Sequence, residues 1–447
     1  MEVSNTVHIV GAGLAGSECA LQLADKGFSV CLYEMRGGTM TPAHKTNQCA
    51  ELVCSNSFGS TMDYAAPGQL KWEASQLNSH ILQAALEAQV PSGMALGVDR
   101  EVFAKTIHDK VHSHPKIKVI EKVIEDIESI PRPTIIATGP LTHTKLAESI
   151  SKHFGTGEFL YFFDAIAPII DADSINMDIA FKASRWGKGG DDYINCPMNK
   201  EQYYTFIEEI QNARKIEPKE FEKDTPFFDA CMPIEEIVRR GIDTPRFGPM
   251  SGKGLDDPKT GRWPYAVVQL RQDNKAATAY NIVGFQTKMA YPEQKRVFSM
   301  IPGLENAEFL KLGSIHRNLY INSPKLLNED LSSKKDPLLF FAGQITGVEG
   351  YFDSTCIGLL VSRFVADKIK GQEPALPPRA SAMGSLLYAI TKEEKENFQP
   401  TNINFGLFPP LGEEHLKGKK KIPKDKKKEL QITLAKEAFS HFLSLTK

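Results

Sequence analysis

Several features of common protein classes are absent from this chain. Its 447 residues contain no apolar run near the roughly 20 residues that cross a bilayer, so no membrane span is predicted. The N-terminus lacks a basic start before an apolar stretch, so we expect no secretory signal and a cytoplasmic protein. No internal repeat is visible. The net charge is only −2, so contact with a nucleic acid would depend on a local basic patch.

Cysteine is scarce, and its spacing shows no motif. The seven cysteines are an odd number, and none belongs to a Cys-x-x-Cys pair. This spacing excludes a redox disulfide of the thioredoxin-reductase kind and argues against a zinc site, so we expect no metal. In a reducing compartment most of these thiols should pack as small hydrophobic side chains. Cys19, in a predicted helix, and Cys31, in a predicted strand, fit that expectation.

The start of the chain carries its clearest motif. An apolar strand, Val7–Val10, runs into a Gly-x-Gly-x-x-Gly turn, and a helical pattern follows. The glycines permit a tight turn and let backbone N–H groups approach a pyrophosphate at the helix N-terminus. A second strand ends at Glu34, whose carboxylate is placed to hold a ribose hydroxyl. The residues of the turn are Gly11, Ala12, Gly13, Leu14, Ala15 and Gly16.

Two later segments favour FAD over NAD as the dinucleotide. Thr134–Gly139 is predicted to be a buried strand that ends in Ala-Thr-Gly, with Gly139 close to the cofactor. A second apolar strand near the other end of the chain runs into Gly343 and Gln344. A helical run from about Asp353 to Lys370 follows, and its N-terminus would present N–H groups to the flavin. No second Gly-x-Gly-x-x-Gly turn follows a strand, so a nicotinamide cofactor has no Rossmann unit of its own.

The pattern of predicted strands and helices changes twice along the chain. Residues 1–150 carry the first cofactor unit and a helical stretch over 70–89. Residues 151–315 alternate short strands with helices, which is typical of an α+β unit. Residues 316–447 resume the cofactor domain. The predicted fold class is therefore α/β: a Rossmann-like FAD-binding domain of glutathione-reductase type, interrupted by an α+β insertion domain.

Basic residues gather in two places. Eight lysines lie between Lys417 and Lys428, and such a run is most often a solvated face. In the middle unit, basic and aromatic residues interleave, which suits phosphate contact with base stacking and equally suits an ordinary enzyme surface. Among these residues are Arg185, Trp186, Arg246, Phe247, Lys253, Arg262, Trp263 and Arg271.

Two cysteines lie in surroundings that are unusual for packed thiols. Cys54 precedes Ser55-Asn56-Ser57, a helix start or a backbone-binding turn, after a polar loop that could return toward the flavin. Cys231 lies just before Pro233, which can open a helix, and a helix N-terminus favours the thiolate. On these grounds each thiol is either reactive or packed.

Each of these cysteines belongs to a short sequence block, and further blocks of the same kind occur across nearly the whole chain. They are residues 34–36, 41–44, 50–57, 135–142, 164–168, 193–198, 231–236, 284–287, 342–351, 398–400 and 404–407. In these blocks the chain resembles the folate- and FAD-dependent tRNA uridine methyltransferases (TrmFO). A more distant resemblance is to the larger wobble-uridine-modifying flavoproteins (MnmG, also GidA), which share the Gly343-Gln344 block but not the two cysteine blocks.

The resemblance implies a reaction. In the family, reduced flavin takes a one-carbon unit from 5,10-methylenetetrahydrofolate and passes it to C5 of a uridine in RNA, and NAD(P)H supplies the reducing equivalents. Uracil C5 becomes nucleophilic once a thiolate adds to C6. Cys231 matches the family position for this addition. Cys54 matches the family's other functional cysteine, which acts near the flavin as the base or as the flavin-side partner.

The resemblance makes the T-loop uridine of tRNA, at tRNA position 54, the leading substrate and 5-methyluridine the product. A uridine of ribosomal RNA, a flavin oxidoreductase of small molecules and a non-catalytic RNA-binding flavoprotein are the alternatives. The chain departs from the family pattern at Asp229-Ala230, Phe58-Gly59 and 352–357. The second departure removes a family arginine, a possible phosphate contact, so it concerns RNA choice more than chemistry. The preferred nicotinamide, the folate-binding residues and the oligomeric state stay open.

Overall fold

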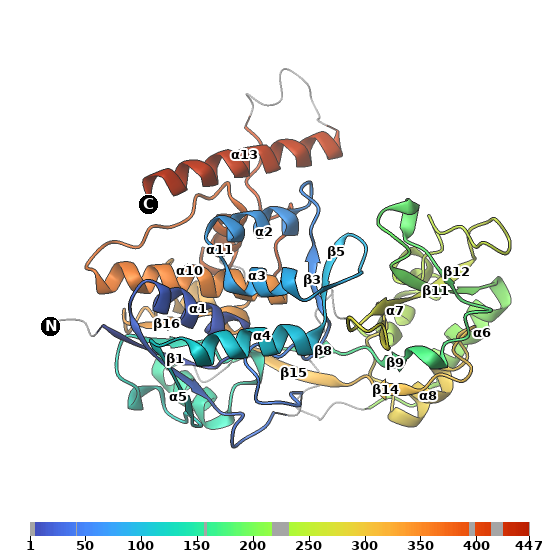
Figure 1. The fold of residues 1–447 in the computed structure, drawn as a ribbon, viewed down its shortest axis with the longest axis horizontal. Helices are drawn as coiled ribbons and strands as arrows, with labels where there is room; N and C mark the ends of the chain where they lie inside the picture. The colour runs from blue at the N-terminus through green and yellow to red at the C-terminus, as the bar shows by residue number, and fades with distance from the viewer. Residues whose placement is uncertain are drawn as a thin grey trace.

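The computed structural model describes residues 5–41, 43–155, 159–216, 232–392, 398–412 and 423–446. Two lobes of unequal size lie side by side along its longest axis (Figure 1). The larger lobe contains the first and last parts of the chain, in blue and orange to red, and the smaller lobe contains the middle part, in green and yellow. Each lobe has its own hydrophobic core.

A five-stranded parallel sheet forms the centre of the larger lobe. Its strands are apolar and buried because helices cover the sheet, as parallel sheets require. The end residues of three adjacent strands are in register, since Val10 lies opposite Ile136 and Ile136 lies opposite Phe341. The chain therefore leaves these strands at one edge. In spatial order the strands are β16 (Leu339–Phe341), β7 (Thr134–Ile136), β1 (Thr6–Val10), β2 (Ser29–Glu34) and β6 (Ile117–Glu121).

Two helices pack closely against this sheet. They are α1 (Leu14–Asp25), which follows the glycine turn, and α10 (Tyr351–Ile369) from near the end of the chain. Gly358 makes the close packing possible, because a Cβ there would lie 2.5 Å from the carbonyl oxygen of Ala15. The thiol of Cys19 donates to the Gly358 carbonyl at 3.0 Å. Cys19 is therefore a packed thiol, as expected.

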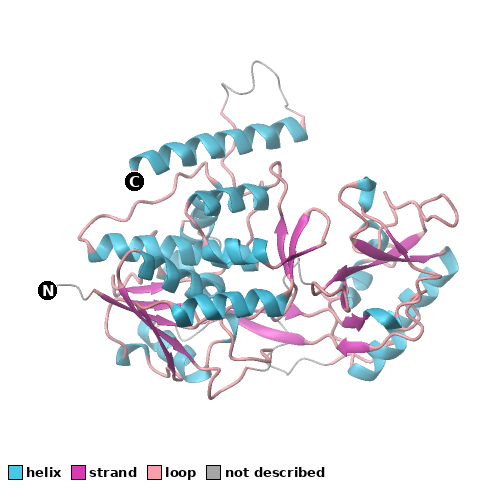
Figure 2. Ribbon diagram, viewed as in Figure 1, coloured by secondary structure: helices cyan, strands magenta, loops and turns pink. Residues whose placement is uncertain are grey.

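The remaining elements of the larger lobe surround this centre (Figure 2). A small antiparallel sheet stands at the side that faces the smaller lobe, in the order β3 (Ser57–Ser60), β5 (Ala95–Val98), β4 (Gln89–Val90). The helices are α2 (Ala66–Gln76), α3 (His80–Glu87), α4 (Arg100–Ser113), α5 (Thr144–Phe154), α9 (Ser323–Leu326), α11 (Ala382–Thr391) and α13 (Lys424–Leu445). Within the described ranges, no helix is both long and apolar enough to span a membrane.

The smaller lobe is built on a six-stranded antiparallel sheet. Tyr203 and Phe206 of its first helix pack with Phe285 and Phe298 in a core separate from that of the larger lobe. The strand order is β10 (Phe181–Lys182), β11 (Tyr193–Met198), β12 (Ala266–Gln272), β13 (Ala279–Ile282), β9 (Ile169–Asp171) and β14 (Phe309–Lys311). The helices are α6 (Lys200–Asn212), α7 (Ile234–Arg240) and α8 (Tyr291–Phe298).

Two antiparallel strands connect the lobes, β8 (Leu160–Ala165) and β15 (Ile315–Tyr320). The boundary expected after residue 150 falls inside α5, whose buried residues all belong to the core of the larger lobe. The chain leaves that core later, through β8. The predicted α/β class, with a Rossmann-like domain and an α+β insertion, is confirmed.

One predicted element is wrong in detail. The helical stretch expected over 70–89 is two helices, α2 and α3, because the chain turns at Asn78, whose φ is 55°. Ser79 then caps α3 by accepting a hydrogen bond from the Leu82 N–H. Asparagine tolerates the left-handed conformation and serine is a favoured N-cap, so local turn chemistry overrides the apolar periodicity.

Candidate active site

A cavity opens where three adjacent strands of the parallel sheet, β16, β7 and β1, end. In folds of this kind, ligands bind outside the carboxyl ends of the strands. Eight of the ten residues predicted to bind the cofactor line the cavity: Gly11, Gly13, Leu14, Ala15, Glu34, Gly139, Gly343 and Gln344. The other two, Ala12 and Gly16, are buried behind it. The fold thus gathers residues from both ends of the chain around one space.

The three glycines of the turn serve different purposes. Gly11 has a φ of 100°, and a Cβ there would lie 2.6 Å from the Ala137 carbonyl oxygen, so this position requires glycine. A Cβ on Gly16 would lie only 1.8 Å from the Gly11 carbonyl oxygen. Gly13, by contrast, has no described atom within 4 Å of the place of a Cβ. That open side, at the N-cap of α1, is where a pyrophosphate could reach the first backbone N–H groups of the helix.

Glu34 is held in place at the end of β2. Its carboxylate accepts hydrogen bonds from the backbone N–H of Ala12 at 2.8 Å and from Nε of Arg36 at 2.9 Å. Burial raises the pKa of Glu34, but the hydrogen bonds and charge of Arg36 outweigh it, so the pKa is lowered. Glu34 is therefore ionised at neutral pH. Its carboxylate faces the cavity and ties the glycine turn to the adjacent strand.

Two buried nitrogen atoms on residues that line the cavity have no hydrogen-bond partner among the described residues. They are Nη1 of Arg36 and Nδ1 of His143. A buried polar atom without a partner costs about 1–3 kcal/mol, so a ligand that pairs with it gains affinity. Sequence reasoning did not find either residue. Arg36 lies in the turn after β2, where the two-residue alternation of a strand no longer predicts the direction of a side chain.

The end of the cavity near the smaller lobe is covered by the start of α10. Tyr351 and Ser354, from its first turn, line the cavity, and no described side chain caps this helix. The helix begins two residues before the predicted Asp353. Its N-terminus therefore presents backbone N–H groups and the positive end of the dipole to this end of the cavity, as the sequence predicts for a flavin ring.

Cys54 lies beside this end of the cavity. Its backbone N–H donates to the hydroxyl of Tyr351 at 2.7 Å, and the preceding residue, Val53, lines the cavity. The Sγ atom lies 4.0 Å from the carbonyl oxygen of Ala165, at the end of β8. The thiol is half-buried. The polar loop therefore does return toward the cavity, as expected.

Asn56, two residues after Cys54, joins the two lobes. Its side-chain amide donates to the carbonyl of Val98 at 3.0 Å and to that of Gln272, in the smaller lobe, at 2.9 Å. The Ser-Asn-Ser sequence was predicted to be either a helix start or a backbone-binding turn. It is the latter, and it leads into β3.

Three basic side chains surround Cys54, two of them from the smaller lobe. Arg100 donates to the Cys54 carbonyl at 3.3 Å, and Lys311 donates to the Val53 carbonyl at 3.1 Å. Nε of Arg271 donates a hydrogen bond to the side-chain oxygen of Asn56 at 3.0 Å. Burial, followed by the positive charges of Arg100 and Lys45, lowers the pKa of Lys311 to about 8. Sequence reasoning placed Arg271 on a surface and missed Arg100 and Lys311.

Cys231 lies outside the described residues, but the segment after it is firmly anchored. Pro233 is the N-cap of α7, and the backbone N–H of Ile234 donates to the carbonyl of Gln286 at 2.8 Å. Glu235 accepts a hydrogen bond from the hydroxyl of Thr287. The blocks 231–236 and 284–287 are therefore in contact. Because α7 has only seven residues, its dipole gives little support to the thiolate argument made from the sequence.

Part of the predicted basic and aromatic surface is present on the smaller lobe. Trp186 and Trp263 are each about half exposed and meet edge to face, with ring centroids 5.4 Å apart. Phe247 is 83% exposed. The guanidinium of Arg246 lies 3.6 Å from the ring centroid of Tyr265. Exposed rings beside cations are what stacking on unpaired bases requires.

Comparisons with known proteins agree with this architecture. The sequence model of the family described as glucose inhibited division protein A matches residues 6–373. A protein of Bdellovibrio bacteriovorus named methylenetetrahydrofolate–tRNA-(uracil-5-)-methyltransferase TrmFO is 68% identical over 98% of this chain and 98% of its own. The protein of that name from Natranaerobius thermophilus is 49% identical over 97% of this chain and 98% of its own.

A solved structure of Aquifex aeolicus GidA superposes on 98% of this chain and 75% of that chain, with a TM-score of 0.68 and 15% identity. At that identity the likeness concerns the fold alone. The family match and the relatives cover most of the chain, including the cavity, Cys54 and the insertion. The chain therefore belongs to the glucose inhibited division protein A family and, within it, to the TrmFO proteins.

Proposed function

We propose that this chain is a methylenetetrahydrofolate–tRNA-(uracil-5-)-methyltransferase that uses FAD and NAD(P)H. It would convert the T-loop uridine at tRNA position 54 to 5-methyluridine. The observation that carries the proposal is the position of Cys54, beside the flavin end of a dinucleotide cavity and among three cations. The relatives that share this chain's full length bear the same enzyme name.

The residues of the cavity fit FAD. The open side of Gly13 and the first turn of α1 would hold the pyrophosphate. Glu34 would hold the adenosine ribose, together with Nη1 of Arg36, which is 3.7 Å from the Glu51 carboxylate but makes no hydrogen bond within the described residues. Gly343 and the N-terminus of α10 would hold the flavin ring. When bound and reduced, FAD supplies the means of carrying the one-carbon unit and its electrons. NAD(P)H would serve as a transient reductant.

The cysteine roles follow from the chemistry of uracil. The thiolate of Cys231 would add to C6, which places electron density on C5 and lets C5 accept the one-carbon unit. Removal of the C5 proton and departure of the thiolate then restore the ring double bond. Cys54, near the flavin end of the cavity, would accept that proton. Its cationic surroundings would also favour the enolate that forms when the thiolate adds.

A chain of contacts supports a shared site for the two cysteines. The Sγ atom of Cys54 faces the carbonyl of Ala165, where β8 enters the smaller lobe. The carbonyl oxygen of Ile166, the residue after Ala165, and the methyl group of Thr287 both flank Gly313. A Cβ on Gly313 would lie 2.6 Å from each of them. Thr287 anchors the segment that follows Cys231. Thr287, which anchors the segment after Cys231, is thus close to the end of β8, the strand that Cys54 faces.

The exposed rings and cations of the smaller lobe would supply the RNA contact. Trp186, Trp263 and Phe247 offer stacking surfaces, and Arg246 and Lys253 offer charge to phosphates. Such contacts suit a loop with unpaired bases better than a regular duplex. An enzyme that uses tRNA, folate and NAD(P)H would work in the cytoplasm.

The deciding experiment maps 5-methyluridine in RNA from cells with and without this gene. We expect loss of the modification from tRNA position 54 and no change in ribosomal RNA. Loss from ribosomal RNA alone would transfer the same chemistry to that substrate, and no loss from either would reject the proposal. Purified enzyme should move label from methylenetetrahydrofolate to tRNA, whereas label from S-adenosylmethionine should not appear.

A further inference from the structure

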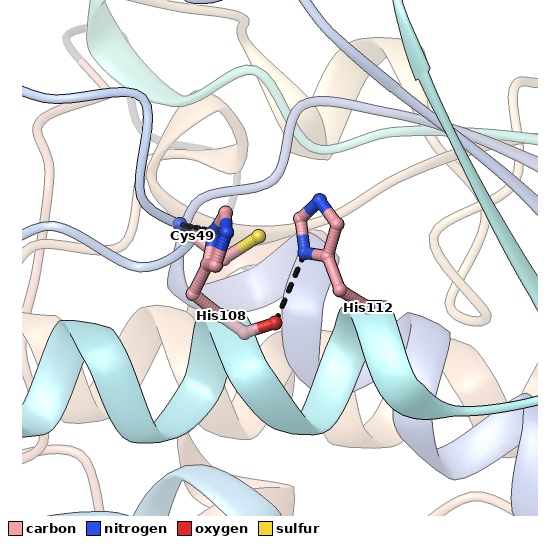
Figure 3. Close-up of side chains that lie close together, drawn as sticks. All are labelled: Cys49, His108 and His112. Carbon is pink, nitrogen blue, oxygen red and sulfur yellow. Dashed lines mark hydrogen bonds between the residues drawn. The ribbon is translucent and has the colours of Figure 1, made fainter.

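Three potential metal ligands meet where the loop before Cys54 packs against α4. They are Cys49, five residues before Cys54, and His108 and His112 on α4. The sulfur and one nitrogen from each ring all lie within 4.8 Å of one another. Figure 3 shows both rings rising from the same face of α4, with the sulfur of Cys49 directed into the space between them.

The two histidines are arranged as a chelating pair. They are four residues apart on one helix, so their rings share a face, and the ring centroids are 3.9 Å apart. His112 Nδ1 is within 3.0 Å of the His108 carbonyl oxygen, to which it can only donate. Its Nε2 therefore carries a lone pair. A hydrogen bond that fixes one ring nitrogen in this way is the usual partner of a metal-binding histidine.

His108 also presents an unprotonated nitrogen next to the thiol. Its Nδ1 accepts a long hydrogen bond, 3.4 Å, from the backbone N–H of Cys49. Neutral imidazole is the form that binds metal ions. Cys49 is buried, and a bound cation would take its sulfur as the thiolate.

The donor set selects the class of cation. One thiolate and two imidazoles suit a borderline-soft ion such as Zn²⁺ and do not suit Mg²⁺ or Ca²⁺, which prefer oxygen ligands. With metal bonds of about 2.0–2.3 Å, tetrahedral ligands stand about 3.3–3.7 Å apart. Small side-chain rotations would close the present arrangement to that geometry. His112 is exposed, so water can occupy a fourth position.

We propose that Cys49, His108 and His112 bind one divalent transition-metal ion of the zinc class. The ion would attach α4 to the loop that supports the dinucleotide turn. Ala50, the next residue, already donates its N–H to the carbonyl of Ala12 in that turn at 2.8 Å. The site is therefore structural, and it is separate from the proposed methyl transfer.

The sequence alone predicts no metal, because the chain has no Cys-x-x-Cys pair. The fold brings the ligands together instead, because Cys49 lies against His108, which is 59 residues further along the chain. This site depends on tertiary structure and has no short motif.

Cobalt(II) is the probe for the test. The FAD-loaded, reduced-thiol protein is first stripped with a chelator and then titrated with Co²⁺, while the d–d bands are followed on the red side of the flavin absorption. We expect one equivalent of tetrahedral Co²⁺, displaced by one equivalent of Zn²⁺. Substitution of a residue that merely supports a ligand weakens metal binding by about 10- to 100-fold, so loss of a ligand should cost at least about 100-fold.

The variants separate metal binding from folding. His112→Gln is on an exposed face and should keep full FAD content while losing tight Co²⁺ binding. Cys49→Ser should remove the thiolate contribution to the spectrum. His114→Gln, at the half-buried histidine that follows the last residue of the same helix, is the matched control and should bind as the unmodified protein does. Failure of the unmodified protein to bind one equivalent, or equal binding by His112→Gln, would overturn the proposal.

Discussion

The glycine turn and the surroundings of Cys54 serve one site but are built in opposite ways. The turn depends on backbone geometry within a few residues, since Gly11 and Gly16 fill positions that no side chain can occupy. The surroundings of Cys54 depend on side chains from the other lobe, because Arg271 and Lys311 reach it from β12 and β14. A cofactor site can thus be specified locally, whereas a reaction site between lobes requires the whole fold.

The comparison separates two kinds of functional loss. Substitutions in the turn should release FAD, and methyl transfer is then lost as a consequence. Substitutions around the cysteines should stop methyl transfer while the protein remains yellow. The measurements below test that separation, beginning with the change expected to have the largest effect.

Replacement of Cys231 by alanine should remove methyl transfer, because alanine cannot add to uracil C6. Loss of a covalent nucleophile lowers turnover on the order of 10⁵-fold or more. FAD content should be unchanged, since the described residues that line the cavity come from 10–53, 122–146 and 342–354. Single-turnover transfer of labelled one-carbon unit to tRNA measures the effect. Cys31→Ala, in β2, is the control. A variant with normal turnover and weaker tRNA binding would show that the thiol only packs.

RNA that contains 5-fluorouridine identifies the nucleophile directly. Fluorine at C5 replaces the proton whose loss releases the enzyme, so the adduct should survive denaturation. We expect the adduct in the unmodified enzyme and its absence in Cys231→Ala. A peptide map that assigns the adduct to Cys54 alone would reverse the two roles.

Replacement of Cys54 by alanine should lower turnover by about 10²- to 10⁴-fold, the usual contribution of a general base. Addition of Cys231 to uracil would still occur, so this variant should accumulate a covalent complex with unmodified tRNA. The complex is detected as a band of reduced mobility under denaturing conditions. If Cys54→Ala shows neither slower turnover nor the complex, the thiol has no part in proton removal.

A pair of glycine substitutions tests the other side of the comparison. A Cβ at Gly16 would meet backbone, so Gly16→Ala should cost about 1–3 kcal/mol of stability and lose FAD. A Cβ at Gly13 would meet no described protein atom, so Gly13→Ala should change apoprotein stability by less than about 1 kcal/mol. It should still weaken FAD binding by at least about tenfold, because the added methyl group enters the cavity.

Denaturation of the apoproteins and titration with FAD measure these two quantities separately. Equal loss of stability in both variants would show that the open side of Gly13 is not the cofactor side. Retention of FAD by both would reject the assignment of the turn.

What the sequence predicts follows the same division. The elements around the turn were predicted because strand, glycine spacing, helix and terminal Glu34 all lie within 34 residues. Arg100 and Lys311 were not, since nothing near them in the sequence indicates that they meet Cys54. The break between α2 and α3 was missed because apolar periodicity continues through Asn78. The role of Arg36 was not predicted, because it lies in the turn after β2 and its position there depends on the hydrogen bonds to Glu34.

The smallest effect concerns Lys311, whose folded-state pKa of about 8 lies below the roughly 10.4 of an unfolded lysine. Between about pH 8 and pH 10 the unfolded chain therefore holds more protons than the folded chain at this residue. By linkage, Lys311 makes the free energy of unfolding rise with pH across that window. Below about pH 8 both states are charged, and the folded state bears the cost of a cation near Arg100.

Lys311→Met should remove this rise. The free energy of unfolding of the unmodified protein, minus that of the variant, should therefore increase as the pH increases from about 7 to about 9.5. Other lysines whose pKa is lowered, such as Lys26 and Lys71, contribute equally to both proteins and cancel in the difference. Lys311→Arg is the control, because its guanidinium stays charged throughout, and its difference from Lys311→Met should not change with pH. Denaturant unfolding at several pH values supplies the data. Parallel profiles for the unmodified protein and Lys311→Met would mean that Lys311 titrates as an ordinary surface lysine, and that the cations around Cys54 are better solvated than their burial indicates.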